Sequence, residues 1–111
     1  MENWAKELPI AITVSDKEGK IIEMNDKSAN TFQAYGGYEL IGKALLACHG
    51  EKAQNTIKSM MENQNINAYT IEKQGQKKLI YQMPWFEKGE FAGLVELSIV
   101  LPEDMPHFIR G

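Results

Sequence analysis

The sequence has little cysteine, no long apolar run and no excess of positive charge, and each of these features excludes a class of function. Its 111 residues include one cysteine, Cys48, which excludes an internal disulfide and favours a reducing compartment. No apolar run approaches the ~20 residues of a membrane-spanning helix, and the first residues lack the basic and apolar regions of a secretory signal. With 12 basic and 15 acidic side chains the net charge is −3, which gives no electrostatic reason to bind nucleic acid or an anionic membrane. We therefore expect a cytoplasmic protein with neither nucleic acid nor a membrane as partner.

The remaining composition is typical of one globular domain. Hydrophobic residues make up 43% and charged residues 24% of the chain, and this length suffices for one modest core. No repeat, low-complexity tract or linker divides the sequence. We expect a short helical lead over residues 1–9, a domain over residues 10–101, and a tail or the start of a linker over residues 102–111.

Hydrophobic periodicity predicts the order of the secondary structure. Period-2 alternation around a glycine-containing turn predicts a first hairpin, and the helical period then predicts helices over Gly37–Ala47 and Glu51–Gln64. The alternating period returns in the last third, where two further turns separate three strands. Because strands joined by hairpins are antiparallel, this order predicts an α+β domain: a five-stranded antiparallel sheet with short helices packed on one face.

Two motifs and their spacing are similar to those of a known family. Residues Asp16 to Asn25 match the hairpin pattern D-x-x-G-x-I-x-x-x-N, and Glu39 to Lys43 read E-L-I-G-K. With Ala29 and Phe32 on the helix between them, nearly the whole chain resembles a PAS domain. The resemblance implies a sensory or interaction module whose pocket, between sheet and helices, holds haem, flavin, a metabolite or nothing. It also implies dimers formed through the outer sheet face or the lead-in helix.

A narrower likeness concerns Cys48 and His49. Gly42-Lys43 followed by Cys48-His49 and Glu51-Lys52 resembles a PAS subgroup that carries N-C-H-P-P-K-S and is sometimes linked to hemerythrin-like domains. The Asn and both prolines of that motif are absent here.

Cys48 and His49 are also the first candidate ligand contacts. A zinc site usually requires four ligands, and one cysteine and two histidines fall short of that number, so we predict no metal site. Haem with His49 as its axial ligand is one alternative. Another is a helix-cap or pocket-wall histidine beside a buried thiol. The Arg-Phe-Leu-Gln that follows the cysteine of flavin photosensors is missing, and the cofactor is left unknown.

Aromatic residues near the C-terminus supply the second pair of candidates. Tyr81, Met83 and Trp85 share one strand face because of their even spacing. Three interpretations are open for this face: core, dimer interface, or the wall of a ligand pocket. We take Cys48, His49, Tyr81 and Trp85 as candidate ligand-binding residues of a pocket between sheet and helices.

The motifs favour a binding module over an enzyme. The sequence has no phosphate-binding loop, no dinucleotide fingerprint and no paired acidic motif. Two functions remain. One is a PAS-type sensory module that binds a small molecule and transmits its presence through a dimer or partner surface; the other is a ligand-free interaction or dimerisation module. A cavity of ~300 Å³ or more favours the first, and a filled core favours the second. The expected partners are a second copy, because Trp4 and Leu94–Leu101 are apolar, and a small molecule, a signalling partner or an output domain.

Overall fold

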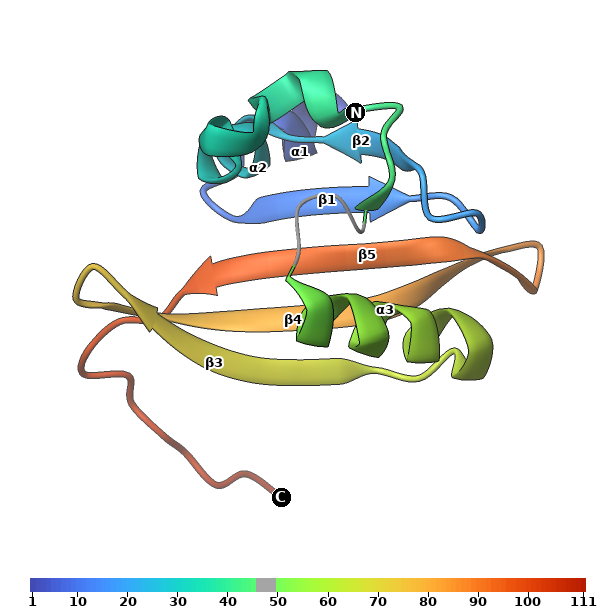
Figure 1. Cartoon of the computed structure of the whole chain (residues 1–111). Helices are drawn as coiled ribbons and strands as arrows, with labels where there is room; N and C mark the ends of the chain where they lie inside the picture. The colour runs from blue at the N-terminus through green and yellow to red at the C-terminus, as the bar shows by residue number, and fades with distance from the viewer. Residues whose placement is uncertain (46–49) are drawn as a thin grey trace.

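A five-stranded antiparallel sheet organises the chain (Figure 1). The computed structural model describes residues 1–45 and 50–111. The strands lie in the order β2-β1-β5-β4-β3, so the first hairpin and the last two strands meet where β1 pairs with β5. The predicted α+β class is confirmed. The strands are β1 (Ala11–Ser15), β2 (Ile21–Met24), β3 (Asn67–Lys73), β4 (Gln76–Glu87) and β5 (Glu90–Val100).

The turn between β1 and β2 is closed by the side chain of Asp16. Its Oδ1 accepts hydrogen bonds from the backbone N–H groups of Glu18 at 3.0 Å and Lys20 at 2.9 Å. Gly19 has a φ of +84°, which a residue without a Cβ adopts at little cost. The aspartate and the glycine of the D-x-x-G motif therefore have direct structural reasons to be there.

Asn25 joins four parts of the fold. It is fully buried, and its Oδ1 accepts from the backbone N–H groups of Ile12 and Ser28, capping the helix α2 (Asp26–Thr31). Its Nδ2 donates to the carbonyl oxygens of Ala5 and Ile10 at 3.0 and 2.7 Å. One side chain thus connects α1 (Asn3–Lys6), the start of β1, the end of β2 and α2.

The helix predicted over Gly37–Ala47 is wrong for the described residues that follow Leu40, and Leu46 and Ala47 lie outside the described residues. Two 3-10 helices, η1 (Gln33–Tyr35) and η2 (Gly37–Leu40), follow α2, and residues 41–43 then form a turn and a bend before Ala44 bridges to Lys20. Gly42 has a φ of +95° and donates to the carbonyl of Ile21 at 2.7 Å, while the Ile21 N–H donates to Lys43. Pairing with β2 therefore replaces helical hydrogen bonds after Leu40.

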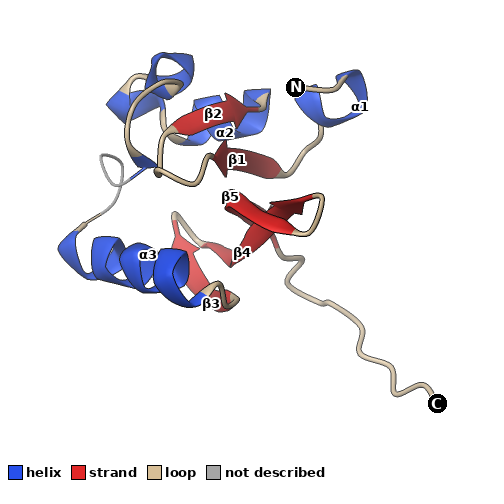
Figure 2. Ribbon diagram, turned by 90° about the vertical axis from the view of Figure 1, so that its right-hand side faces the viewer, coloured by secondary structure: helices blue, strands red, loops and turns tan. Residues whose placement is uncertain are grey.

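Helix α3 (Glu51–Asn63) contributes the central part of the core, and it ends one residue before the end of the predicted helix, Glu51–Gln64. It lies across one side of the sheet, while α1 and the C-terminal tail lie toward the other side (Figure 2). Ile57 and Met60 are buried on its sheet-facing side. The core cluster joins these two side chains to Ile21, Met24, Leu40, Leu45 and Leu94.

The two faces of the sheet differ in chemistry. We call the side covered by α3 the inner face and the opposite side the outer face. Register places Thr13, Glu96, Gln82 and Asn67 side by side across four strands, and this polar row is on the inner face. The outer face carries the alternate, apolar positions, Val14, Leu79, Tyr81, Met83, Trp85, Val95, Leu97 and Ile99.

Candidate functional site

A cavity lies between the N-terminal half of α3 and the inner face of β3 and β4. Its volume is about 630 Å³, and both polar and apolar surface lines it. Figure 1 shows α3 lying in front of these strands. The described lining residues are Gly50, Glu51, Lys52, Thr56, Asn67, Tyr69 and Gln82.

A chain of side-chain hydrogen bonds forms the floor of the cavity. Gln82, only 4% exposed, donates from Nε2 to Glu96 Oε2 at 2.7 Å. Its Oε1 accepts from Asn67 Nδ2 at 2.9 Å. Since a carboxylate only accepts hydrogen bonds, Glu96 fixes which way both amides point. The floor is therefore polar and ordered.

The row of polar groups continues past Glu96 to helix α2. Thr13 is the register partner of Glu96 on β1, and its hydroxyl hydrogen-bonds that of Ser28 at 2.5 Å. Both residues are buried. A row of polar side chains thus extends from α2 to the cavity. Burying polar groups costs free energy unless they are hydrogen-bonded, so an apolar core would be less costly at these positions.

The pKa of Tyr69 is shifted by its position in the cavity wall. Its pKa is raised, first because burial disfavours the tyrosinate and second because the Glu96 carboxylate repels it. Glu51 and Lys52, both exposed, carry opposite charges at the rim. Glu96, whose carboxylate contributes to the raised pKa of Tyr69, is half-buried in β5.

Two of the candidate residues, Cys48 and His49, lie outside the described residues. They directly precede Gly50, the residue before α3, which lines the cavity. Their contact with a ligand stays a prediction.

The structure corrects the placement of Tyr81 and Trp85. They do share a strand face, as their spacing indicates, but register with β5 puts that face on the outside of the sheet. Trp85 instead lines a second hollow, of about 470 Å³, beside the β1–β2 and β4–β5 turns. Spacing along a strand shows which side chains point the same way, and only the position of α3 shows which way is inward.

Trp85 also has a structural partner. Its indole Nε1 donates to the carbonyl oxygen of Ser15 at 2.9 Å. Gly93, the register partner of Trp85, makes this contact possible, because a Cβ there would lie 1.9 Å from the same carbonyl oxygen. The indole thus joins β4 to the end of β1 across β5.

The sequence interpretation missed Asn67, Tyr69, Gln82 and Glu96. A signal for two of them was present: Gln82 interrupts the apolar run of β4, and Glu96 interrupts that of β5. A polar residue at regular inward positions of an otherwise apolar strand is unusual enough to mark a site. No local pattern marks Asn67 or Tyr69, because β3 is mostly exposed.

The outer face presents an apolar surface in this chain. Val95, Leu97 and Ile99 of β5 are half-buried rather than covered. Trp4 in α1 is 72% exposed. Apolar and aromatic side chains gathered in this way are typical of an interface.

Within the described residues, no helix has the length and apolar character needed to cross a bilayer. In the same part of the chain, no three His, Cys, Asp or Glu side chains come together as a metal site would require.

The arrangement of the sheet is that of known sensory domains. No protein-family model matches the sequence, and no curated protein matches it significantly. Among solved structures, the PAS domain of the histidine kinase ThkA is similar with a TM-score of 0.66 and 21% identity, over 81% of this chain and 97% of that one. The PAS domain of BvgS from Bordetella pertussis gives a TM-score of 0.64 and 19% identity, over 90% of this chain and 82% of that one.

A third similar structure is a receptor from Vibrio cholerae described as a dual PAS-haem oxygen sensor. Its TM-score is 0.61 and its identity 17%, over 84% of this chain and 95% of that one. The similar structures are predominantly PAS domains of sensor kinases and receptors. The fold is therefore an α+β fold that this chain shares with those domains. It is the PAS fold, as the sequence motifs predicted.

Proposed function

We propose that this chain is a PAS-type sensory module that binds a small molecule between α3 and the inner sheet face. The observation that carries the proposal is the cavity of about 630 Å³, which exceeds the ~300 Å³ at which small-molecule sites begin. Its nearly buried floor residue, Gln82, supplies a fixed polar group of the kind that orients a ligand. The PAS domains of kinases and receptors that share this fold support a signalling role.

Gln82, Asn67 and Tyr69 are the ligand contacts that we propose from the described residues. Cys48 and His49, which lie outside the described residues, remain proposed contacts because they directly precede Gly50 in the chain. No described lining residue is a histidine, cysteine or methionine, so haem ligation in this cavity would depend on His49 alone. An absorbance spectrum of the purified protein, above the aromatic band, distinguishes a haem or flavin from a colourless ligand.

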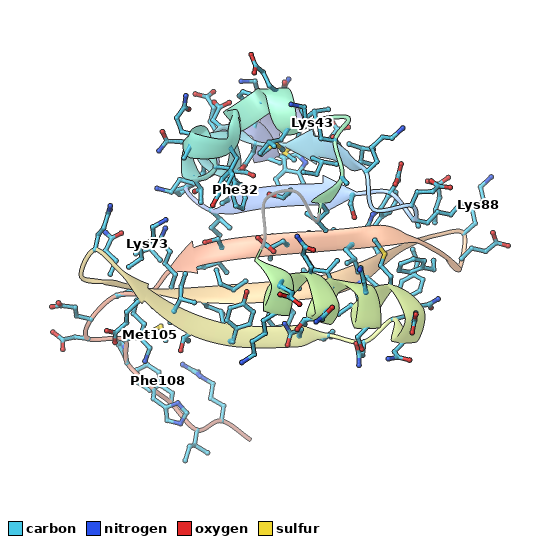
Figure 3. All side chains as sticks on the ribbon, in the orientation of Figure 1. Phe32, Lys43, Lys73, Lys88, Met105 and Phe108 are labelled. Atoms are coloured by element: carbon cyan, nitrogen blue, oxygen red, sulfur yellow. The ribbon has the colours of Figure 1, made fainter. Side chains whose placement is uncertain are left out.

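Transmission from the cavity runs through the sheet in this proposal. Gln82 and Glu96 sit on the inner face of β4 and β5, and their chain neighbours Tyr81, Val95 and Leu97 sit on the outer face. A shift of these strands on binding would alter the outer surface, where we propose that a second copy or a signalling partner docks. The tail that follows β5 leaves the sheet, with Phe108 away from the domain (Figure 3), and offers a route to an output domain.

A cavity-filling variant tests ligand binding. Thr56 lines the cavity from α3, so Thr56→Trp fills it, whereas Asn63→Trp adds the same side chain at an exposed position on the same helix. In a thermal-shift screen of metabolites, we expect compounds that stabilise wild type and Asn63→Trp to leave Thr56→Trp unchanged. A compound that stabilises all three proteins equally does not bind in this cavity.

The ligand-free interaction module is the second candidate, because the outer face is apolar and half-exposed. It predicts that no metabolite shifts the melting temperature while light scattering still reports a dimer. The sensory proposal predicts both a dimer and a ligand-dependent shift. The two measurements together separate these functions.

A further inference from the structure

The free edge of β3 and the C-terminal tail each lack a backbone hydrogen-bond partner among the described residues. We propose that residues 106–111 of the tail dock as a sixth strand on this edge, beside a groove that β3 forms with α3. The edge is then a peptide-binding surface, and its occupant is the tail of the same chain, which stands away from the sheet in this structure (Figure 3). This proposal goes beyond the sensory function and does not depend on a ligand in the cavity.

The two edges of the sheet differ in how they are covered. On β2, Ile21 exchanges backbone hydrogen bonds with Gly42 and Lys43, at 2.7 and 2.8 Å, so this edge is paired. Strand β3 pairs with β4 along its seven residues and, in the part of the chain that the structure describes, with no other strand. It has neither a proline nor a bulge, two of the features that stop an edge strand from pairing. The β3 edge is therefore open to a further strand.

A groove of about 420 Å³ lies between α3 and the start of β3. Lys52, Thr56 and Ser59 line it from the helix, and Ile66 and Asn67 line it from the other side. Because successive side chains of a strand point to opposite faces, a strand on the β3 edge directs every second side chain to the inner face, where this groove lies. The groove therefore leaves room for the side chains of a docked segment.

The tail carries apolar side chains that are exposed to solvent. Phe108 is 69% and Ile109 is 92% exposed, and the Arg110 guanidinium lies 5.5 Å from the centre of the Phe108 ring. Since Phe108 and Ile109 are adjacent, docking as a strand directs one of them to the inner face. On that face of β3, Tyr69 and Ile71 are 40% and 37% exposed. An apolar pair across two strands stabilises a sheet, so docking satisfies the tail and the edge together.

The tail starts beside β3 and runs in a direction that allows pairing. Leu101 donates to a backbone carbonyl of Lys77, the second residue of β4, and Glu103 lines a hollow together with Glu72, near the end of β3. Strands β3 and β5 run the same way, because each is antiparallel to β4. A tail that turns around the end of β3 therefore runs back antiparallel to it. Figures 1 and 2 both show the tail continuing on the β3 side of the sheet.

The length of the tail is sufficient for this path. The proposed strand lies three strand spacings from β5, or ~14 Å, and the chain from Leu101 to Pro106 spans up to ~17 Å. Residues 106–111 then extend ~20 Å along the ~23 Å of β3. Pro106, which has no backbone N–H, falls at the first position of the new strand, where proline is tolerated.

Hydrogen exchange of the β3 amides, followed by NMR in the ¹⁵N-labelled full chain, tests the docking. The amides of β3 that do not bond to β4 face the free edge. We expect them to exchange about tenfold more slowly in wild type than in the double variant Phe108→Asp, Ile109→Asp, because a carboxylate on either face of the docked strand disfavours its burial. Met105→Asp, exposed in the same tail but ahead of the proposed strand, is the control and should match wild type. The β3 amides that bond to β4 should exchange equally in all three proteins, which shows that each is folded.

Protein concentration separates the occupants of the edge. Docking of the chain's own tail is intramolecular, so the slow exchange should be unchanged after a dilution of about tenfold. Slow exchange that is lost on dilution assigns the edge to the tail of a second copy, and slow exchange that the double variant keeps assigns it to another segment. Either result overturns the proposal. Equally fast exchange of the edge amides in wild type and the double variant shows that the edge stays open, and it overturns the proposal as well.

Discussion

Replacing Asn25 by alanine is expected to cost much of the stability of the domain. The side chain is fully buried and makes four hydrogen bonds to backbone groups of Ala5, Ile10, Ile12 and Ser28. Each is worth about 1 kcal/mol net, and the groups left behind are mostly away from water. We therefore expect Asn25→Ala to lower the free energy of unfolding by about 3–5 kcal/mol. That is a large part of the ~5–15 kcal/mol typical of a domain.

The assay is equilibrium unfolding in urea, followed by far-UV circular dichroism. The loss corresponds to a fall in Tm of about 15–25 °C for a domain of this size. Asn30→Ala is the matched control, because Asn30 is exposed in the same helix, α2, and should change stability by less than about 0.5 kcal/mol. A loss below about 1 kcal/mol for Asn25→Ala would refute the role of this side chain as the junction of four segments.

An aspartate at position 25 tests separately the two hydrogen bonds that Asn25 Nδ2 donates. Asn25→Asp keeps the two acceptor bonds but sets a carboxylate against the carbonyl oxygens of Ala5 and Ile10, which raises its folded-state pKa. A raised pKa contributes stability that is present below the unfolded value, about 3.9, and is lost as the pH rises through the folded value. The stability gap between variant and wild type should therefore be smaller at pH 4.5 than at pH 7.5. An equal gap at both pH values would contradict this.

Three further predictions concern the close approach at Gly93, the ion pair of Asp26 and the outer face of the sheet. Gly93→Ala places a Cβ 1.9 Å from the Ser15 carbonyl oxygen, so the free energy of unfolding in urea should fall by about 2–4 kcal/mol. Gly75 also has a positive φ but has open space around it, so Gly75→Ala should lower the free energy of unfolding by about 1 kcal/mol. Equal losses for the two variants would refute the steric argument. The pKa of Asp26 is lowered by a hydrogen bond from Tyr38 and, to a smaller extent, by one from Lys6. The contribution of Asp26 to stability is therefore present above pH 3.8 and is lost as the pH falls through its folded-state pKa. Asp26→Asn should lower the urea midpoint at pH 7 and not in stronger acid, and a difference from wild type that persists in acid would contradict this. Tyr81→Glu on the outer face should convert a dimer into a monomer in light scattering, and a wild-type monomer at high micromolar concentration would count against the dimer.

Local patterns in the sequence were enough to predict the fold. Alternation, turn residues and one amphipathic stretch predicted the five strands in their order along the chain and α3, because each depends on neighbours within a few positions. Asp16 and Asn25 were recognised in a motif, and the structure gives their physical reason, a closed turn and a buried junction. The helix predicted after Leu40 failed because Gly42 pairs with Ile21, a residue 21 positions away, and periodicity carries no information about such pairing.

The candidate site was harder to predict, for a similar reason. Even spacing predicted Tyr81 and Trp85 as walls of the pocket, yet the strand face that they share lies on the outside of the sheet. The inner positions hold Glu96 and Gln82, whose meaning depends on a partner from a third strand, Asn67. Polar residues on separate strands become a site only once register brings them side by side.

Hydrogen–deuterium exchange tests the central claim most directly, because it shows where a ligand binds. The protein is compared with and without a compound that stabilises it in the thermal-shift screen. We expect slower exchange in the first turns of α3 and in β3, the two elements that form the cavity walls, and unchanged exchange there when Thr56→Trp is used. Protection confined to other segments, or protection that survives in Thr56→Trp, would contradict a ligand site between α3 and the inner sheet face.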